Sequence, residues 1–379
     1  MTTPSRGRVI ECPVCLSDFG WDDAPLLVAD SANALVAVDW SSLPPSTNRE
    51  AMLARAYRTC PGTQVTGPHN LPERYLRYDT EPVRIGLVGG PGTGKSHLLA
   101  AMIHQATDTS LMRPYGLSAR GLDLVQFLTY RDTVITPLIR HRLQLPVTRT
   151  ATVNLTVGLE VTATEGASRR THAVVFFDVA GERLQRSGPE SDFINGLNAL
   201  LCVVDPAHVR GLALRSDAGR SAAGGDVAVE TVLERLRQTR AASGDPFLPL
   251  PCALVVTKSD LLRHRGFHEV ERWLTESSAA AADLSTVEQE SADVYAMLAA
   301  RCDSSWLRPA LECEDSTLHL ASPTGTASDP VPGEDGELRF PERAFRQQRV
   351  LRPLLALLAM KGVVSERAVG RLGRGGVAR

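Results

Sequence analysis

The sequence predicts an α/β fold, in which buried strands alternate with helices. Three apolar runs are typical of buried strands, and each ends in polar residues: Thr171–Phe177, Leu197–Val204 and Cys252–Val256. A fourth run, Val83–Val88, leads into a glycine-rich loop, and residues 98–103 beyond that loop have helical apolar spacing. An apolar fraction of 43% is ordinary for a globular protein with a substantial core.

The glycine-rich loop fits the pattern G-x-x-x-x-G-K-[ST]. Its glycines let successive backbone N–H groups turn toward one anion, and the helix that follows adds the positive end of its dipole. We expect Lys95 to reach the outer phosphates of a nucleotide and the Ser96 hydroxyl to bind Mg²⁺. The predicted nucleotide-binding residues of this segment are Gly89, Gly90, Pro91, Gly92, Thr93, Gly94, Lys95, Ser96 and His97.

Lysine is rare in this chain. Of 41 basic residues, only Lys95, Lys258 and Lys361 are lysine, and arginine takes nearly every other cationic position. Lysine offers a compact ammonium on a thin stem, which the planar fork of arginine cannot replace. Its retention at Lys95 and Lys258 therefore indicates a specific requirement there, whereas Lys361 near the C-terminus is expected to be incidental.

Two further strand ends carry residues that suit a nucleotide. Asp178 ends the Thr171–Phe177 strand, where an aspartate can hold the Mg²⁺ shell through water, and Gly181 lets a backbone N–H approach the γ-phosphate. Such a D-x-x-G sequence alone is no more than a strand-ending turn. Downstream of a phosphate-binding loop, we interpret it as part of the same site.

The motif after the Cys252–Val256 strand predicts which base is bound. Thr257, Lys258 and Asp260 fit the pattern [NT]-K-x-D, in which the carboxylate accepts from N1–H and the exocyclic amine of guanine. Adenine offers a lone pair and no amine there, so it would leave the carboxylate unpaired. Ser322, after a last short strand, is placed where a backbone amide can contact the base oxygen. The predicted cofactors are thus GTP or GDP with Mg²⁺.

The first 80 residues have a different character, and they predict a zinc site. Cys12 and Cys15 form a C-P-x-C knuckle that can grip one Zn²⁺, and Cys60 and His69 would complete a Cys₃His tetrahedron. The alternative is a solvent-exposed thiol pair, with Cys60 and His69 incidental. Seven cysteines with only one close pair do not make a disulfide framework.

The remaining elements are predicted from apolar spacing, turn residues and caps. We expect a hairpin of residues 26–29 with 34–40, a helix at 49–58 capped by Asn48 or Thr47, helices at 95–106, 227–241, 270–301 and 345–360, strands at 153–164 and 318–321, and a loop at 323–338. Residues 108–146 are interpreted as an inserted helical segment, with a kink near Pro137. The predicted division is a zinc-binding module at 1–80, a nucleotide-binding domain at 81–365 and a disordered basic tail at 366–379.

With these motifs in this order, the chain resembles GTPases of the Ras and translation-factor class (TRAFAC) over about residues 83–365. The resemblance implies a P-loop GTPase fold with a mostly parallel, six-stranded sheet and helices on both faces. The zinc-knuckle start also looks like a bacterial GTPase family of the double-GTPase type, predicted to act in conflict (defence) systems. In these proteins a protein effector or a partner GTPase is the expected partner.

The catalytic residues are where the sequence departs from this class. The switch threonine that binds Mg²⁺ has three candidates, Thr148, Thr150 and Thr152, of which we favour Thr150. Glu182 stands where Ras-like proteins carry the glutamine that orients the attacking water. A carboxylate can accept from water but also repels the γ-phosphate, so slow turnover without a partner is expected. Arg149 is either an internal arginine finger or an exposed arginine.

The sequence as a whole favours a cytoplasmic, GTP-hydrolysing molecular switch. A net charge of −2 predicts no general affinity for nucleic acid, and no apolar run is long enough to span a membrane. An ATP-driven enzyme and a nucleotide-binding structural module without turnover are the alternatives. The [NT]-K-x-D motif argues against the first, and intact Lys95, Ser96 and Asp178 argue against the second.

Overall fold

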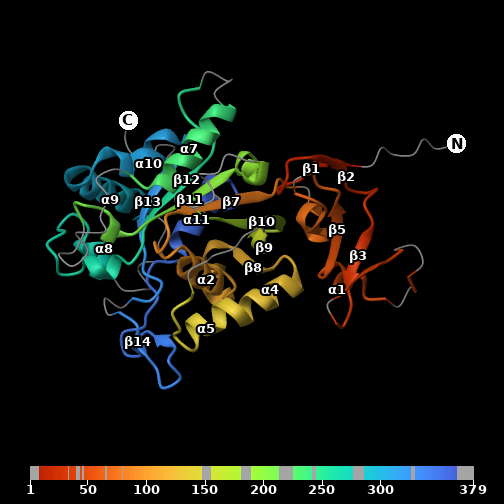
Figure 1. Ribbon diagram of the computed structural model, residues 1–379, viewed down its shortest axis with the longest axis horizontal. Coiled ribbons are helices and arrows are strands. Elements are labelled where there is room, and N and C mark those ends of the chain that lie inside the picture. Colours follow the sequence, from red (N-terminus) through yellow and green to blue (C-terminus); the bar gives the residue numbers. More distant parts are fainter. Residues whose placement is uncertain are drawn as a thin grey trace.

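The computed structural model describes residues 8–32, 34–39, 43–44, 47–64, 66–78, 80–146, 155–180, 189–212, 225–240, 245–275, 286–325 and 329–364. Its middle layer is a seven-stranded sheet with the order β13-β12-β11-β7-β10-β9-β8 (Figure 1). These strands span Val83–Gly89 (β7), Leu117–Gly121 (β8), Leu155–Glu165 (β9), Ser168–Ala180 (β10), Ala199–Val204 (β11), Cys252–Val256 (β12) and Ser316–Leu320 (β13). The pairings from β13 to β10 are parallel, and β9 and β8 add antiparallel.

The sheet was expected to have six strands, but it has seven. Leu117–Gly121, inside the segment predicted to be helical, forms β8 and pairs with β9 from Leu117 opposite Ala163 to Gly121 opposite Leu159. Helices occupy the rest of this insertion: Thr109–Met112 (α3), Leu124–Tyr130 (α4) and Thr136–Ile139 (α5). A π-helical turn at Arg131–Ile135 separates α4 from α5 just before Pro137, so the helix departs from α geometry where the kink is predicted.

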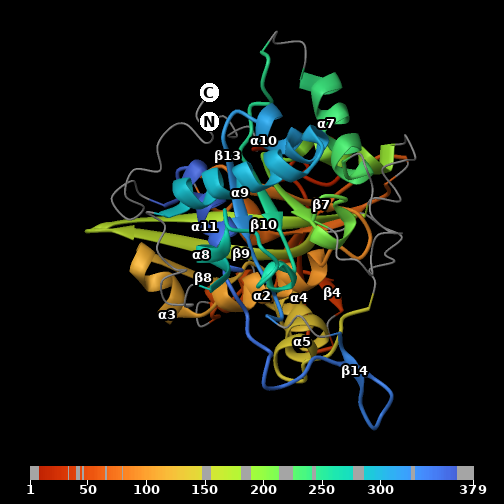
Figure 2. The same ribbon diagram turned by 90° about the vertical axis from the view of Figure 1, so that its left-hand side faces the viewer.

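Helices cover both faces of the sheet, as predicted (Figures 1 and 2). One face carries α7 (Val227–Arg240), α9 (Val287–Arg301) and α10 (Arg308–Glu312), and the other carries α2 (Lys95–Ala106) and α11 (Arg352–Met360). Side chains of β11 alternate between the two cores: Leu200 and Cys202 pack on the α7 side, and Leu201 and Val203 on the α2 side. This arrangement buries every residue of β11.

Two predicted helices are shorter than the apolar spacing indicated. The C-terminal helix begins at Arg352 instead of Phe345, because Gln348 pairs with Ser322 and Arg349 adopts a positive φ of 58°. The predicted helix at 49–58 ends at Leu53 (α1, Arg49–Leu53), because Ala56–Cys60 forms strand β5. The Asn48 cap is confirmed: its Oδ1 accepts from the Ala51 N–H at 3.1 Å.

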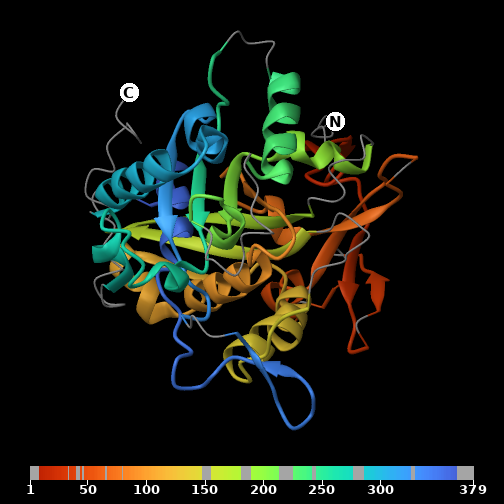
Figure 3. The same ribbon diagram turned by 60° about the vertical axis from the view of Figure 1, so that its left-hand side comes forward.

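Residues 270–301 contain two helices, α8 (Glu271–Thr275) and α9, and the segment between them lies outside the described residues. The predicted loop at 323–338 includes part of a short hairpin, β14 (Val331–Pro332) with β15 (Leu338–Arg339), that projects from the body (Figure 3). The hairpin is tied to the chain before residue 147, because the Gln144 N–H donates to the Leu338 carbonyl at 2.8 Å.

The N-terminal residues form their own small sheets at one end of the molecule (Figure 1). Strands Val9–Glu11 (β1) and Asp18–Gly20 (β2) make one hairpin. Leu26–Ala29 (β3), Leu35–Ala37 (β4), Ala56–Cys60 (β5) and His69–Pro72 (β6) make a four-stranded sheet in the order β4-β3-β5-β6, which contains the predicted hairpin. Apolar side chains of this module share one core with Phe177 and Phe193, so the two parts are packed together. Their division into separate domains stays a prediction.

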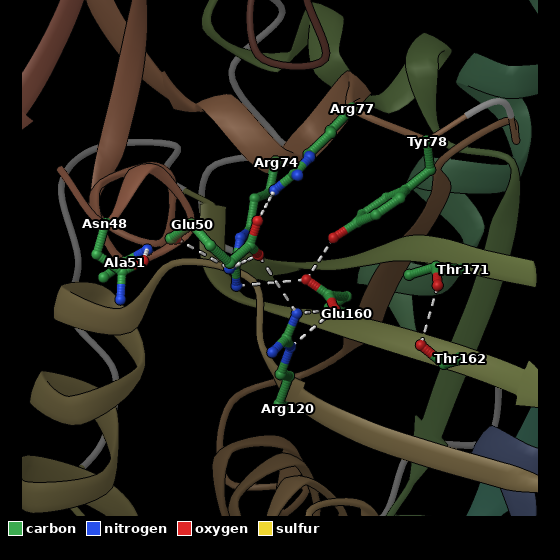
Figure 4. A network of polar contacts seen from close by, with 10 residues as sticks. All are labelled: Asn48, Glu50, Ala51, Arg74, Arg77, Tyr78, Arg120, Glu160, Thr162 and Thr171. Atoms are coloured by element: carbon green, nitrogen blue, oxygen red, sulfur yellow. Dashed lines mark hydrogen bonds and ion pairs between the residues drawn. The ribbon is translucent and has the colours of Figure 1, made fainter. Parts of the chain in front are cut away.

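A partly buried ionic network also joins the module to the central sheet (Figure 4). Glu160 of β9 is 4% exposed and lies 2.5 Å from Arg120 of β8 and 3.4 Å from Arg74 of the module. The Tyr78 hydroxyl donates to the same carboxylate. Arg74 in turn pairs with Glu50 of α1 at 2.5 Å. Because β9 pairs with β10, which carries Asp178, this network joins the module to the strand next to the predicted site.

Candidate functional site

The loop predicted to bind phosphate (the phosphate loop) joins β7 to α2 at the carboxyl edge of the sheet. β7 ends at Gly89 and α2 begins at Lys95, as predicted. Gly94 is the helix cap, with φ of 90°, a conformation that a side chain would strain. The loop is closed on itself by the Thr93 hydroxyl, which donates to the Gly90 carbonyl at 2.9 Å. The start of α2, where helix N–H groups and the dipole favour an anion, therefore lies directly after this loop.

Lys95 folds back over this loop. Its ammonium donates to the carbonyls of Gly89 and Gly90, the second at 2.8 Å. Burial lowers the pKa of Lys95, and the negative charges of Asp178 and Asp226 oppose that effect. Two negative charges, one on β10 and one just before α7, thus act on the ammonium.

Asp178 lies beside the loop, opposite Leu87 in the parallel pairing of β10 with β7. Its backbone N–H donates to the Thr156 hydroxyl at 3.1 Å. The Oδ1 atom is buried and has no hydrogen-bond partner among the described residues. Burial raises the pKa of this carboxyl, and the charge of Lys95 opposes it. A buried carboxylate oxygen without a hydrogen-bond partner is suited to contact a cation or a water molecule bound to that cation. The residues present therefore fit a Mg²⁺ ion at this place.

The residues predicted to bind the base adjoin the phosphate loop. The Thr257 hydroxyl donates to the Thr93 carbonyl at 2.6 Å. Lys258 has a φ of 49°, donates to the Gly92 carbonyl at 3.0 Å, and forms an ion pair with Asp205. The motif after β12 and the loop after β7 are therefore one connected structure.

Asp260 and Ser322 meet at the end of this motif. Asp260 is 4% exposed, and the Ser322 hydroxyl donates to its Oδ1. Burial raises the pKa of Asp260, and the hydrogen bond from Ser322 opposes that effect. The Ser322 N–H donates to the Gln348 carbonyl at 2.9 Å, and a contact of a backbone amide here with the base oxygen stays a prediction. The Ser322 hydroxyl orients the Asp260 carboxylate.

His97 connects α2 to two other segments. Its Nε2 accepts from the Leu145 N–H at 3.1 Å, and its ring meets Phe340 edge-on with 5.9 Å between centroids. Burial, together with the charge of Lys258, lowers the pKa of His97 to about 4, which keeps the accepting nitrogen unprotonated at neutral pH. A contact of His97 with nucleotide stays a prediction.

Several predicted catalytic residues fall on parts of the chain that lie outside the described residues: Thr148, Arg149, Thr150, Thr152, Gly181 and Glu182. Two functional candidates were missed by sequence reasoning. Asp205 carried a signal, since it follows a buried strand as Asp178 does. Asp226, whose Oδ2 accepts from the Gly90 N–H at 2.6 Å, belongs to no motif and is found only in three dimensions.

The N-terminal module gathers Cys12, Cys15, Cys60 and His69. Their ligand atoms all lie within 4.8 Å of one another, with Cys12 Sγ 2.9 Å from His69 Nε2. The three cysteines are buried, so the alternative of an exposed thiol pair is wrong. Cys60 stands opposite His69 in the antiparallel pairing of β5 with β6, which is how distant residues are brought together.

The environment of this cluster fits a tetrahedral metal site. The His69 Nδ1 lies 3.1 Å from the Gly67 carbonyl, so that an Nδ1–H donates there and Nε2 is left for a metal. Backbone N–H groups of Val14 and Gly62 donate to the sulfurs of Cys12 and Cys60 at 3.4 and 3.3 Å, which stabilises thiolates. Three sulfurs and one imidazole form a donor set that suits Zn²⁺.

No protein-family profile and no curated protein match the chain. Among solved structures, it is similar to the GTPase-like domain of S. cerevisiae Ski7 bound to GTP, with 9% identity, a TM-score of 0.31, and coverage of 77% of this chain and 51% of that chain. The same domain bound to GDP and inorganic phosphate has 11% identity to this chain and a TM-score of 0.29, and the match covers 74% of this chain and 50% of that chain. The signal recognition particle receptor SRb-GTP/SRX complex of Chaetomium thermophilum has 12% identity and a TM-score of 0.28, and the match covers 66% of this chain and 96% of that chain.

The chain thus spans about half the length of the Ski7 chains that it matches. These likenesses are distant, so the assignment of function depends on the site itself. Among the described residues, no helix is both long and apolar enough to cross a membrane.

Proposed function

We propose that this chain is a Mg²⁺-dependent GTPase that acts as a molecular switch. One observation carries the proposal: groups suited to phosphate, metal and guanine meet at a single edge of the sheet. The Gly89–Ser96 loop follows β7, Asp178 belongs to the neighbouring β10, and Asp260 follows β12. Thr257 and Lys258 donate hydrogen bonds to carbonyls of the phosphate loop. The residues that would hold the base therefore adjoin the residues that would hold the phosphates.

The phosphate end depends on two changes of partner. Lys95 would exchange the carbonyls of Gly89 and Gly90 for the outer phosphate oxygens, which are stronger acceptors for an ammonium. Ser96 and the unpartnered Oδ1 of Asp178 would hold the Mg²⁺ shell. The metal, when bound, neutralises charge that develops on the transferring phosphoryl group.

The part of the site that would bind the base suits a base edge that carries hydrogen-bond donors. The Asp260 carboxylate is buried and fixed through Oδ1 by Ser322, so it can accept two hydrogen bonds from guanine with little further ordering. Adenine would place a lone pair against this carboxylate. An ATP-driven enzyme, the second candidate, is therefore disfavoured by the same contact.

Turnover and signalling are assigned from the sequence. Thr150 and Gly181 would respond to the γ-phosphate, Glu182 would act on the attacking water, and the change would expose a surface for a protein effector or a partner GTPase. A cytoplasmic role in a bacterial conflict system is the corresponding biological setting. A nucleotide-binding module without turnover is the alternative, and a turnover assay separates the two.

The Cys12, Cys15, Cys60 and His69 cluster would hold one structural Zn²⁺. Four protein ligands leave no open coordination position, so the metal would stabilise the fold and not take part in hydrolysis. Because the module shares its core with Phe177 and Phe193, zinc would brace the β10 side of the domain.

The proposal is tested by GTP hydrolysis and nucleotide affinity in Lys95→Ala, with Lys361→Ala as the matched control. Lys361 caps the end of α11 that is remote from the Ser322–Gln348 pairing, and both variants remove one ammonium. Lys95→Ala should lose tight GTP binding and turnover while its circular dichroism stays unchanged, and Lys361→Ala should behave as wild type. Normal GTP affinity in Lys95→Ala would refute the phosphate site.

A further inference from the structure

The carboxylate of Asp226 bridges the phosphate loop and helix α7. Its Oδ2 accepts from the Gly90 N–H at 2.6 Å, and its Oδ1 accepts from the Ala228 N–H at 2.9 Å. The Asp226 carbonyl accepts from the Glu230 N–H at 2.9 Å, which begins the first turn of α7. Both oxygens are therefore held by backbone donors, and the side chain has a fixed position against the loop.

Glycine at position 90 leaves room for this contact. A Cβ built there would lie 3.0 Å from Oδ2 of Asp226, tighter than most real contacts of this kind. The loop pattern itself places no requirement on this residue, which is one of its unspecified positions. Gly90 thus allows a carboxylate to approach the loop backbone closely.

The same peptide region receives the ammonium of Lys95. Lys95 donates to the Gly90 carbonyl at 2.8 Å, and the charge of Asp226 raises the pKa of Lys95 against the effect of burial. The lysine of such a loop reaches the β- and γ-phosphates. Asp226 therefore places a negative charge across the Gly89–Gly90 peptide from this ammonium, in addition to the charge of Asp178.

We propose that Asp226 is a specificity-determining residue that weakens the binding of GTP relative to GDP. The γ-phosphate brings further negative charge to the end of the site where this carboxylate lies, whereas GDP leaves that position open. Like charges a few ångströms apart interact strongly enough to change a binding constant by about tenfold or more. The positive charges of Mg²⁺ and Lys95 offset part of the repulsion between Asp226 and the γ-phosphate. The repulsion that is left lowers the affinity for GTP.

This inference rests on the proposed function, and one set of measurements separates the two. Labelled GDP and a non-hydrolysable GTP analogue are titrated with Mg²⁺ into wild type, Asp226→Asn and Glu234→Gln. Asparagine keeps the shape and the acceptor oxygen but removes the charge. Glu234 is an exposed residue of α7, the helix that follows Asp226. Both variants remove one negative charge, so they have the same net charge.

Asp226→Asn should raise the affinity for the GTP analogue about tenfold relative to GDP, and Glu234→Gln should leave the ratio unchanged. The wild-type preference for GDP should also shrink as salt is raised, because the repulsion is screened. An unchanged ratio in a folded Asp226→Asn overturns the inference, and failure of wild type to bind either nucleotide overturns the proposed function. If Asp226→Asn does not fold, Asp226→Ser is titrated in its place with the same expected ratios, because serine also removes the charge and keeps the helix cap.

Discussion

Glu290→Gln tests the buried ionic cluster that supports the Ser322 loop. The Glu290 side chain is fully buried on α9, and its carboxylate lies 2.6 Å from Arg352 and 2.8 Å from Arg349. Its Oε1 also accepts from the Leu320 N–H at 3.0 Å, two residues before Ser322. Glutamine keeps the shape but leaves two buried guanidinium groups without their carboxylate.

The expected cost follows from the charges. Breaking a buried ion pair from one side costs about 3 to 5 kcal/mol, a large share of a total free energy of unfolding of about 5 to 15 kcal/mol. The pKa of Glu290 agrees with this: burial raises it, but His319 with Arg349 and Arg352 outweigh burial and hold it at about 2, below its ordinary value of 4.5. That difference corresponds to about 3 kcal/mol.

The difference also predicts a pH dependence. Because the folded state has the lower pKa, the stabilisation is complete above pH 4.5 and is lost as pH falls toward 2. Burial also lowers the pKa of His319, whose Nδ1 lies 3.3 Å from the Glu290 carboxylate. The stability gap between wild type and Glu290→Gln should therefore be widest above pH 4.5 and should narrow below it.

The assay is urea unfolding followed by circular dichroism and tryptophan fluorescence. Trp273 is a useful reporter, because the Arg349 guanidinium lies 5.2 Å from its ring centroid. Glu288→Gln, an exposed site on the same helix, is the control and should change stability by less than about 0.5 kcal/mol. If Glu290→Gln unfolds at the same urea concentration as wild type at pH 7, the cluster does not stabilise the fold in the way described.

Two further variants test the metal module and turnover. Protein purified without chelators should carry one Zn²⁺ per chain, Cys60→Ser should lose it, and a chelator should loosen residues 8–75 first; absence of zinc from the wild-type protein by elemental analysis would contradict the assignment. Glu182→Ala should lower the single-turnover GTPase rate by about ten- to a hundredfold with affinity nearly intact if Glu182 orients water, whereas a faster Glu182→Gln would show that it acts as a brake. Rates unchanged in both variants would show that another group positions the water.

Local signals predicted the parts of the fold that depend on local chemistry. The bounds of α2 and β12 follow directly from a glycine loop and an apolar run, and the structure has them at Lys95–Ala106 and Cys252–Val256 as predicted. β8 was missed because Leu117–Gly121 is short and becomes a strand only by pairing with β9. The start of α11 was misplaced for a similar reason, since the pairing of Gln348 with Ser322 joins segments far apart in the sequence.

The candidate site was predictable to the same extent. Motif residues such as Asp260 were found because their order and strand-end positions carry the signal. Asp226 was not, because its contact with Gly90 joins residues far apart along the chain and leaves no pattern. The hydrogen bond from the Ser322 hydroxyl to Asp260 was not predicted either, because Ser322 is positioned by its pairing with the distant Gln348.

The most direct test of the central claim is competition for the site between nucleotides of different bases. Labelled GDP bound to wild type should be displaced by GDP and GTP but not by ATP or xanthosine diphosphate. In Asp260→Asn the acceptor carboxylate becomes an amide, so GDP affinity should fall by about tenfold or more and xanthosine diphosphate should now compete. Displacement by ATP as effective as by GTP, or unchanged GDP affinity in Asp260→Asn, would contradict the assignment of this protein as a guanine-nucleotide switch.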